Sequence, residues 1–185
     1  LADAGPWKSW AEAALALPLV LPPTVLGYYF IVAFAGKSLF GEPLVFSFTG
    51  LLVASLIINL PFAIQPIQRA FEAIPPEIKE AAKVSGLNTW QRFRLIELPL
   101  AWRGILSGAA MTFAHTLGEF GVVLMVGGAI PGETKTASIA IYDKVQTFDT
   151  AGAGSLSLIL LLISLIAIAI SYGVLGKPKA GSHRA

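Results

Sequence analysis

The chain has 185 residues, of which 55% are hydrophobic and 13% are charged. Because a soluble domain usually carries about 25% charged residues, this composition argues against a soluble globular protein and for a surface that faces lipid. Cysteine is absent, which excludes a disulfide framework and a thiolate metal site, and the net charge of +2 is too small to indicate a partner by itself.

The amino-terminal segment begins at Leu1, without an initiator Met and without a charged-then-apolar signal segment. We therefore expect an N-terminal portion to be missing. The stretch from Trp7 to Ala14 begins with two tryptophans, a residue that favours the headgroup level of a membrane. It is expected to start an interfacial helix.

Four stretches are apolar enough to cross a bilayer, which takes roughly 20 helical residues each. They cover about 15–35, 44–66, 101–127 and 154–176, and they predict an all-α, multi-span membrane protein with a single transmembrane domain over 1–176.

Internal features distinguish these spans. Pro18, Pro22 and Pro23 remove backbone donors from the first span and are expected to bend it. Gly118 and Gly121 predict a break or tilt near the end of the third span. The fourth span is the plainest lipid-facing one.

Orientation follows from the lysines and arginines, which concentrate on the cytoplasmic side of membrane proteins. With the 67–100 loop inside, ten of the thirteen basic residues are cytoplasmic, and only Lys37, Lys135 and Lys144 are outside. The loop is therefore predicted to be cytoplasmic, with 177–185 as a flexible cytoplasmic tail. This distribution explains the basic residues without nucleic acid.

The 67–100 loop has the pattern of two short helices joined by a hinge. Pro75 and Pro76 suit the first turn of a helix, and Gly86 suits the residue that follows its end. Asn88 is expected to cap a second helix, with Gln91 completing a capping box. Leu98-Pro99 is expected to end that second helix.

The residues of this loop resemble the EAA motif in the permease subunits of ATP-binding-cassette importers. The resemblance rests on Glu80-Ala81-Ala82, on Gly86 and on Ile96-x-Leu98-Pro99. It implies that the two helices dock into a groove of a cytosolic ATPase and pass its closure to the membrane helices. Glu80 would offer a charge, Ala81 and Ala82 close approach, and Gly86 a sharp turn. The alternative is an ordinary amphipathic helix pair.

Two further segments are similar to molybdate permeases: 17–28, and 114–121 followed by 130–136. The similarity covers about residues 15 to 175. The family's first transmembrane helix is absent before Leu1, and His115 stands where relatives often carry Arg. The resemblance implies a permease homodimer, an external molybdate-binding protein and a cytosolic ATPase subunit.

Glu119 is the most unusual residue within a span, because an ionisable group in a membrane usually faces a cavity or a partner. At ~1.5 Å per residue it lies roughly 27 Å along the helix from Ala101, near the outer boundary of the bilayer. It is either an interface-level carboxylate bonded to backbone or part of an external gate. His115 lies one turn earlier and either pairs with Glu119 or faces the pathway.

Other polar and small residues are also ambiguous. Asn59 either bonds between helices or lines the pathway, whereas Gly104 and Gly108 allow either close packing within one subunit or a dimer contact. The pathway or gate candidates are therefore Asn59, His115, Gly118, Glu119 and Gly121.

Catalysis by this chain is not expected. The segment Gly127-x-x-x-x-Gly132-Glu133-Thr134 has the spacing of a phosphate-binding loop, but Glu133 replaces the essential lysine. No nucleophile–base set is evident, and two histidines are too few to suggest a metal site. We expect no catalytic residue, no metal and no cofactor in this chain.

The sequence is thus interpreted as the permease subunit of an ATP-driven molybdate importer in the cell membrane, working by alternating access. A sulfate, thiosulfate or tungstate permease is the nearest alternative. A secondary transporter driven by an ion gradient is the alternative from another class, but it would need charged residues near the bilayer centre and no coupling loop. A membrane-embedded enzyme is a third, with only His115–Glu119 as a polar pair at depth.

Overall fold

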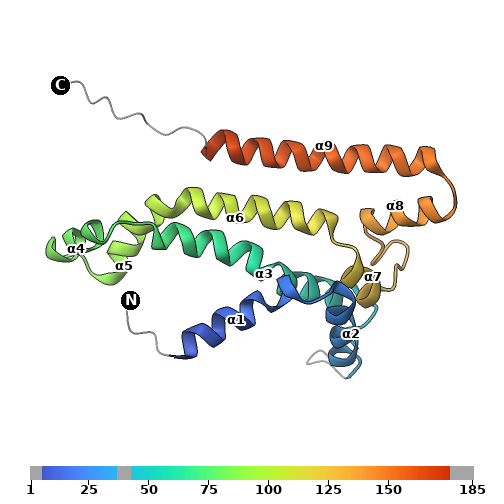
Figure 1. The fold of residues 1–185 in the computed structure, drawn as a ribbon, viewed down its shortest axis with the longest axis horizontal. Helices are drawn as coiled ribbons and strands as arrows, with labels where there is room; N and C mark the ends of the chain where they lie inside the picture. The colour runs from blue at the N-terminus through green and yellow to red at the C-terminus, as the bar shows by residue number, and fades with distance from the viewer. Residues whose placement is uncertain (1–5, 37–42, 176–185) are drawn as a thin grey trace. The chain divides into compact units, whose positions relative to one another are not determined.

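The structure is a computed structural model that describes residues 6–36 and 43–175, and all the regular elements in these ranges are helices (Figure 1). They are α1 (Pro6–Val20), α2 (Pro23–Phe34), α3 (Phe48–Glu72), α4 (Pro76–Val84), α5 (Thr89–Arg92), the π-helix η1 (Phe93–Glu97), α6 (Leu98–Gly118), α7 (Gly121–Gly127), α8 (Ala137–Gln146) and α9 (Thr150–Leu175). The predicted tail at 177–185 lies outside the described residues.

The chain divides into two compact units. The first contains Leu1–Pro61 and His115–Leu162, and the second contains Phe62–Ala114 and Ile163–Ala185.

The predicted first span is not one continuous helix. Pro22 is extended, with φ −56° and ψ 138°, and Pro23 opens α2 at a position where a missing N–H costs nothing. The helices on either side of this point are bent by 110°. The prolines therefore do more than bend the segment, because they divide 15–35 into two helices.

The core of the first unit lies where α2, α3 and α7 meet, since α2 packs against α7 along most of its length. Small and branched side chains of α3 and α7 are buried there, and larger side chains of α2 cover them; the set is Ala54, Ile58, Val122 and Val126, with Leu26, Phe30 and Phe34. This packing fixes α7 at the end of the third predicted span.

The predicted break in that span is confirmed. α6 ends at Gly118, α7 begins at Gly121, and the helices on the two sides are bent by 63°. Glu119 and Phe120 form the connection, so the side chain of Glu119 extends from a non-helical part of the backbone.

In the second unit, α6 packs closely on the end of α3. A Cβ atom on Gly104 would overlap the Cβ of Ala70, and one on Gly108 would come within 2.8 Å of the carbonyl oxygen of Ala63. The two glycines therefore serve close packing within the chain, as one of the two interpretations predicted.

The expected helix end at Leu98-Pro99 is wrong. The chain runs from α5 through η1 into α6 without leaving a helical conformation, and the amide of Leu98 donates to the carbonyl of Phe93. A π-turn bonds each amide one residue further back than an α-turn does, so the helix admits Pro99, which has no amide proton, in the first turn of α6.

The membrane-spanning potential of the helices follows their length and composition. Among the described residues, α3 and the Thr150–Ile170 part of α9 are each long and apolar enough to cross a bilayer. Two bent pairs reach this level only if each counts as one span: Trp10–Val20 with Pro23–Phe34, and Thr89–Gly118 with Gly121–Gly127.

Candidate functional site

Two regions contain the residues that the sequence singled out: the segment from α4 to η1, and the connection between α6 and α7. The first begins with the paired prolines. Pro75 is extended and precedes α4, Glu77 lies in the first turn and Lys83 in the last, so both charges complement the helix dipole. Lys79 Nζ donates to the carbonyl oxygen of Phe71 at 3.1 Å, which ties α4 to the end of α3.

The hinge of this segment has the geometry that the sequence predicted. Gly86 has φ +79°, a left-handed conformation that glycine adopts without steric cost. Asn88 then caps α5: its Oδ1 accepts from the Gln91 amide at 2.8 Å, and the Gln91 side chain accepts from the Asn88 amide at 3.0 Å. The capping box is confirmed.

An aromatic stack and an ion pair hold α5 and η1. The ring of Phe93 stacks between those of Phe71 and Trp90, with ring centroids 5.9 Å and 5.7 Å away. Arg92 Nε donates to Glu97 Oε1 at 2.8 Å, so a half-buried ion pair joins the residue before the π-helix to its last residue.

The EAA-motif residues occupy different positions in this segment. Glu80, Ala81 and Gly86 are exposed, whereas Ala82 is buried. Half-buried Leu98 and exposed Pro99 lie in the first turn of α6.

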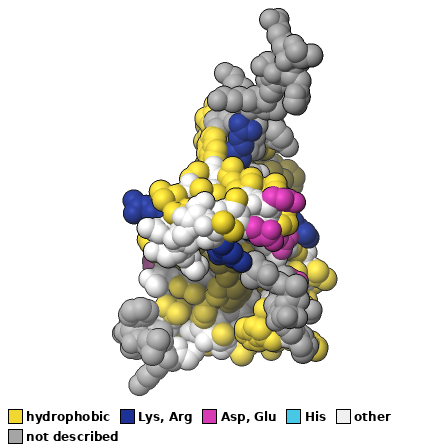
Figure 2. Space-filling view, turned by 90° about the vertical axis from the view of Figure 1, so that its left-hand side faces the viewer, with side chains coloured by type: hydrophobic (Ala, Val, Ile, Leu, Met, Phe, Trp, Pro, Cys, Tyr) yellow, Lys and Arg dark blue, Asp and Glu magenta, His cyan; other side chains and the backbone are white. Residues whose placement is uncertain are grey.

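The exposed side of the segment also presents apolar side chains. Val84 is 89% and Trp90 66% exposed, and Figure 2, which views the end of the molecule that carries α4 and α5, shows acidic and basic side chains beside hydrophobic ones. A mixed surface of this kind suits a protein partner.

The second region is centred on Glu119, which is buried at 9% exposure. Its Oε2 atom accepts hydrogen bonds from the Ser55 hydroxyl at 3.1 Å and from Asn59 Nδ2 at 3.2 Å, both on α3. Its Oε1 atom is buried and has no hydrogen-bond partner among the residues that the structure describes. The two oxygens of one carboxyl group therefore have different environments.

Asn59 bridges the cluster, and its hydrogen-bond partners determine which way its side-chain amide is oriented. Its Nδ2 also donates to the carbonyl oxygen of Ser55 at 2.8 Å, and a carbonyl oxygen only accepts. The Oδ1 atom must then be the atom 3.0 Å from His115 Nδ1, which makes that ring nitrogen the donor. His115 and Glu119 are thus linked through Asn59, which joins α3 to both.

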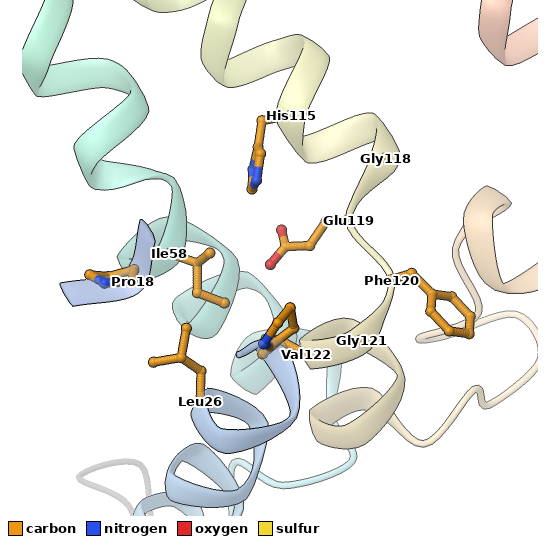
Figure 3. Close-up of a pocket in the computed structure, with 10 residues that line it drawn as sticks. Pro18, Leu26, Ile58, His115, Gly118, Glu119, Phe120, Gly121 and Val122 are labelled. Carbon is orange, nitrogen blue, oxygen red and sulfur yellow. The ribbon is translucent and has the colours of Figure 1, made fainter. Parts of the chain in front are cut away.

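A cavity of about 270 Å³ adjoins the cluster (Figure 3). Apolar side chains and backbone make up most of its wall, and His115 and Glu119 are the titratable residues in it; the others are Pro18, Pro23, Leu26, Ile58, Gly118, Phe120, Gly121 and Val122. Four of the five pathway or gate candidates line the cavity, and the fifth, Asn59 on α3, is hydrogen-bonded to two of them, His115 and Glu119.

Two serines that the sequence interpretation left out complete the site. Ser55 lies one turn before Asn59 on the same face of α3, a spacing of four that a helical projection reveals. Ser138 Oγ, on α8, donates to the backbone carbonyl of Glu119 at 2.7 Å. Nothing in the sequence near Ser138 indicates that contact.

The segment with phosphate-loop spacing is a tight turn. Thr134 is 1% exposed; its hydroxyl accepts from the Ile130 amide at 2.9 Å and donates to the carbonyl of Gly127. The hydroxyl group is thus used to close the turn that leads into α8.

Charged pairs join α8 to the residues just before it and just after it. Lys135 pairs with Asp143, and Lys144 with Asp149 at 2.7 Å. The hydrogen bond from Lys144 lowers the pKa of Asp149 below its ordinary value, and a bond from the Gly152 amide acts in the same direction.

Comparison with known proteins identifies the family. The family described as binding-protein-dependent transport system inner membrane component matches residues 5–177. A molybdenum transport system permease protein of Azotobacter vinelandii is 42% identical over 173 residues, which are 89% of this chain and 76% of that protein. Its counterpart in Escherichia coli (strain K12) is 35% identical over 175 residues, 90% of this chain and 76% of that protein.

More distant similarity extends to another transport system. A sulfate transport system permease protein of Escherichia coli (strain K12) is 30% identical over 168 residues, 87% of this chain and 61% of that protein. The matches, together with the long apolar helices, confirm the predicted all-α, multi-pass membrane protein. The chain belongs to the family of inner membrane components of binding-protein-dependent transport systems.

Proposed function

We propose that this chain is the permease subunit of an ATP-driven importer that moves molybdate across the cytoplasmic membrane by alternating access. The observation that carries the proposal is the order of similarity. Molybdenum permeases are 35% to 42% identical to the chain, and sulfate permeases 30%.

The segment from α4 to η1 is proposed as the surface that binds a cytosolic ATPase. Glu80 and Ala81 are exposed on α4, and Gly86 forms the turn between the helices. The Lys79 bond and the aromatic stack attach this segment to Phe71 of α3, and η1 continues directly into α6. A push on α4 would therefore reach α3 through the Lys79 bond, and α6 through α5 and η1.

The connection between α6 and α7 is proposed as part of the external gate. It is a break in an otherwise helical span, and Gly118 and Gly121 lie on either side of Glu119. Asn59 and His115 would hold the gate to α3 when it is shut. A homodimer of this chain and an external molybdate-binding protein complete the proposed assembly.

The experiment is uptake by vesicles that contain the permease and its ATPase, with labelled molybdate, tungstate or sulfate delivered by the matching binding protein. We expect uptake of molybdate that requires ATP and the binding protein. Uptake of sulfate but not molybdate would favour a sulfate permease. Uptake that follows an ion gradient without ATP would contradict the proposed class.

A matched pair of variants connects the assay to the proposed surface. Glu80→Arg reverses an exposed charge of the motif, whereas Glu77→Arg reverses one in the first turn of the same helix, outside the motif. Loss of ATPase binding is expected for the first and not for the second. Equal binding of the ATPase by both variants would remove Glu80 from the docking surface.

A further inference from the structure

The buried carboxyl group of Glu119 is bonded on one side only. Oε2 accepts from Ser55 and Asn59, whereas Oε1 is enclosed without a partner among the described residues. A buried ionised oxygen without a donor is far more costly than a neutral one. The two donors already occupy Oε2, so a proton bound by this carboxyl group belongs on Oε1.

Glu119 also connects four helices. Its side chain bonds to α3, its backbone carbonyl accepts from Ser138 of α8, and its position in the chain is the break between α6 and α7. A change in the conformation of the Glu119 side chain would therefore break the hydrogen bonds that hold the connection between α6 and α7 to α3.

The adjoining cavity gives the side chain a place to go. It has a volume of about 270 Å³. Glu119 is one of the residues that line it (Figure 3). Water in a cavity of this size would solvate a carboxylate that turned into it, since a single water needs far less room.

We infer that Glu119 is a proton-operated latch: with a proton on Oε1 it holds the α6–α7 break to α3, and after losing that proton it turns into the cavity. The two conformations bind different numbers of protons, so pH shifts their populations. High pH favours release of the latch, and low pH favours the closed arrangement that the structure describes.

Other titratable groups near the latch define the controls. Among the described residues that line the cavity, His115 of α6 is the other one that titrates, while Ser55 and Asn59 of α3 and Ser138 of α8 carry no charge. The walls from α1, α2 and α7 are apolar or backbone. His115→Gln keeps a donor for Asn59 and removes the imidazole.

Two measurements on the intact transporter complex test the latch. The first is an infrared titration, in which the parent protein should show the band of a protonated carboxylic acid that disappears as the pH rises. Glu119→Gln should lack that band, and His115→Gln should keep it. A band absent from the parent protein at every pH, or still present in Glu119→Gln, would overturn the inference.

The second measurement uses the absence of cysteine from the chain. Leu26→Cys places a thiol in the cavity wall, and Val145→Cys places one on the exposed side of α8, where it records the intrinsic effect of pH on thiol labelling. The ratio of the two labelling rates should rise about tenfold per pH unit while Glu119 remains mostly protonated, because release of one proton is coupled to opening.

The same ratio of labelling rates, measured in the Glu119→Gln and His115→Gln proteins, identifies the residue that releases the proton. It should stay low and flat with Glu119→Gln, whose amide is neutral at every pH, and still rise with His115→Gln. A rise that persists with Glu119→Gln, or that vanishes with His115→Gln, would contradict the assignment. Neither measurement uses transported molybdate, so failure of the latch leaves the proposed function standing.

Discussion

The segment from α4 to η1 and the Glu119 cluster are built in opposite ways. Hydrogen bonds of the first join residues three to eight positions apart, as between Asn88 and Gln91 or Lys79 and Phe71. In the second, the side-chain bonds that hold His115 and Glu119 to α3 join residues 56 to 64 positions apart, since Ser55 and Asn59 lie on α3 whereas His115 and Glu119 lie at and just after the end of α6. The cap and the turn of the first depend on neighbouring residues, whereas the second exists only when α3 and α6 are correctly packed.

The largest effect should come from the hinge of the local segment. Gly86→Val places a β-branched residue at φ +79°, where no neighbouring atom lies within 4 Å of a Cβ, so the cost is conformational. A left-handed residue with a side chain costs about 1–2 kcal/mol, and valine more, so we expect at least about a tenfold loss of ATPase binding and uptake.

The matched control is Gly86→Asn, because asparagine tolerates the left-handed region. It should retain most of the ATPase binding measured by co-purification. If Val and Asn behave alike, the backbone conformation of the hinge is not what the partner requires.

Close packing of α3 on α6 should give the next largest effect. Gly104→Ala adds a Cβ that overlaps the Cβ of Ala70, and overpacking of this kind typically costs about 1–3 kcal/mol. Thermal unfolding in detergent should show a lower Tm, and Ala70→Gly in the same protein should restore part of it.

The control for this change lies on α9. Gly154→Ala meets no atom within 4 Å and should leave the Tm unchanged or slightly raised, because alanine is the better helix former. A fall in Tm for Gly154→Ala as large as that for Gly104→Ala would mean that packing is not the cause.

A pair of asparagines compares the two regions directly. Asn59→Ala removes the bridge between His115 and Glu119, and the loss of these two hydrogen bonds should cost about 1–3 kcal/mol. Asn88→Ala removes a helix cap, which typically costs ~1 kcal/mol and concerns α5 alone. Backbone amide hydrogen exchange should become faster throughout α3 and α6 in Asn59→Ala, and only within α5 in Asn88→Ala. Exchange confined to one turn around Asn59 would contradict the comparison.

The smallest effect is expected at an exposed pair that belongs to neither region. Because Asp149 has a lowered pKa in the folded protein, its carboxylate stabilises the folded state at pH values above the ordinary pKa of 3.8. That stabilisation is lost as the pH falls through the lowered pKa of the folded state. Asp149→Asn should therefore lower the Tm slightly at neutral pH, and its Tm should converge with that of the parent protein at acid pH. A difference that persists at the most acid pH would assign the effect to something other than this charge.

The extent to which sequence predicted structure follows the same division. The Asn88–Gln91 box and the turn at Gly86 were predictable because caps and turns depend on neighbouring residues. The break at Gly118 and Gly121 was predictable for the same reason. The continuation of the helix that begins at Thr89 was not, because the wide turn at 93–97 depends on how Arg92 and Glu97 pair and on how Phe93 stacks on Phe71.

The Glu119 site was predictable only in part. Its unusual carboxyl group was evident, since an ionisable residue in an apolar span is rare. Its partners were not, because Ser55 and Ser138 are ordinary helical serines whose relevance depends on the packing of α3 and α8. Asn59 was recognised as polar, but its place between His115 and Glu119 required three dimensions.

The π-helix Phe93–Glu97 has a geometric consequence for the residues on either side. An α-helix turns by about 100° per residue, and a wide turn that takes up one extra residue offsets the helix before it by that angle. Deleting one residue between Arg92 and Leu98 would therefore leave α5 and α6 as intact helices while pointing α5 in another direction. The number of residues in this short stretch thus sets the orientation of α5 about the helix axis. That orientation determines the direction from which a partner would have to approach.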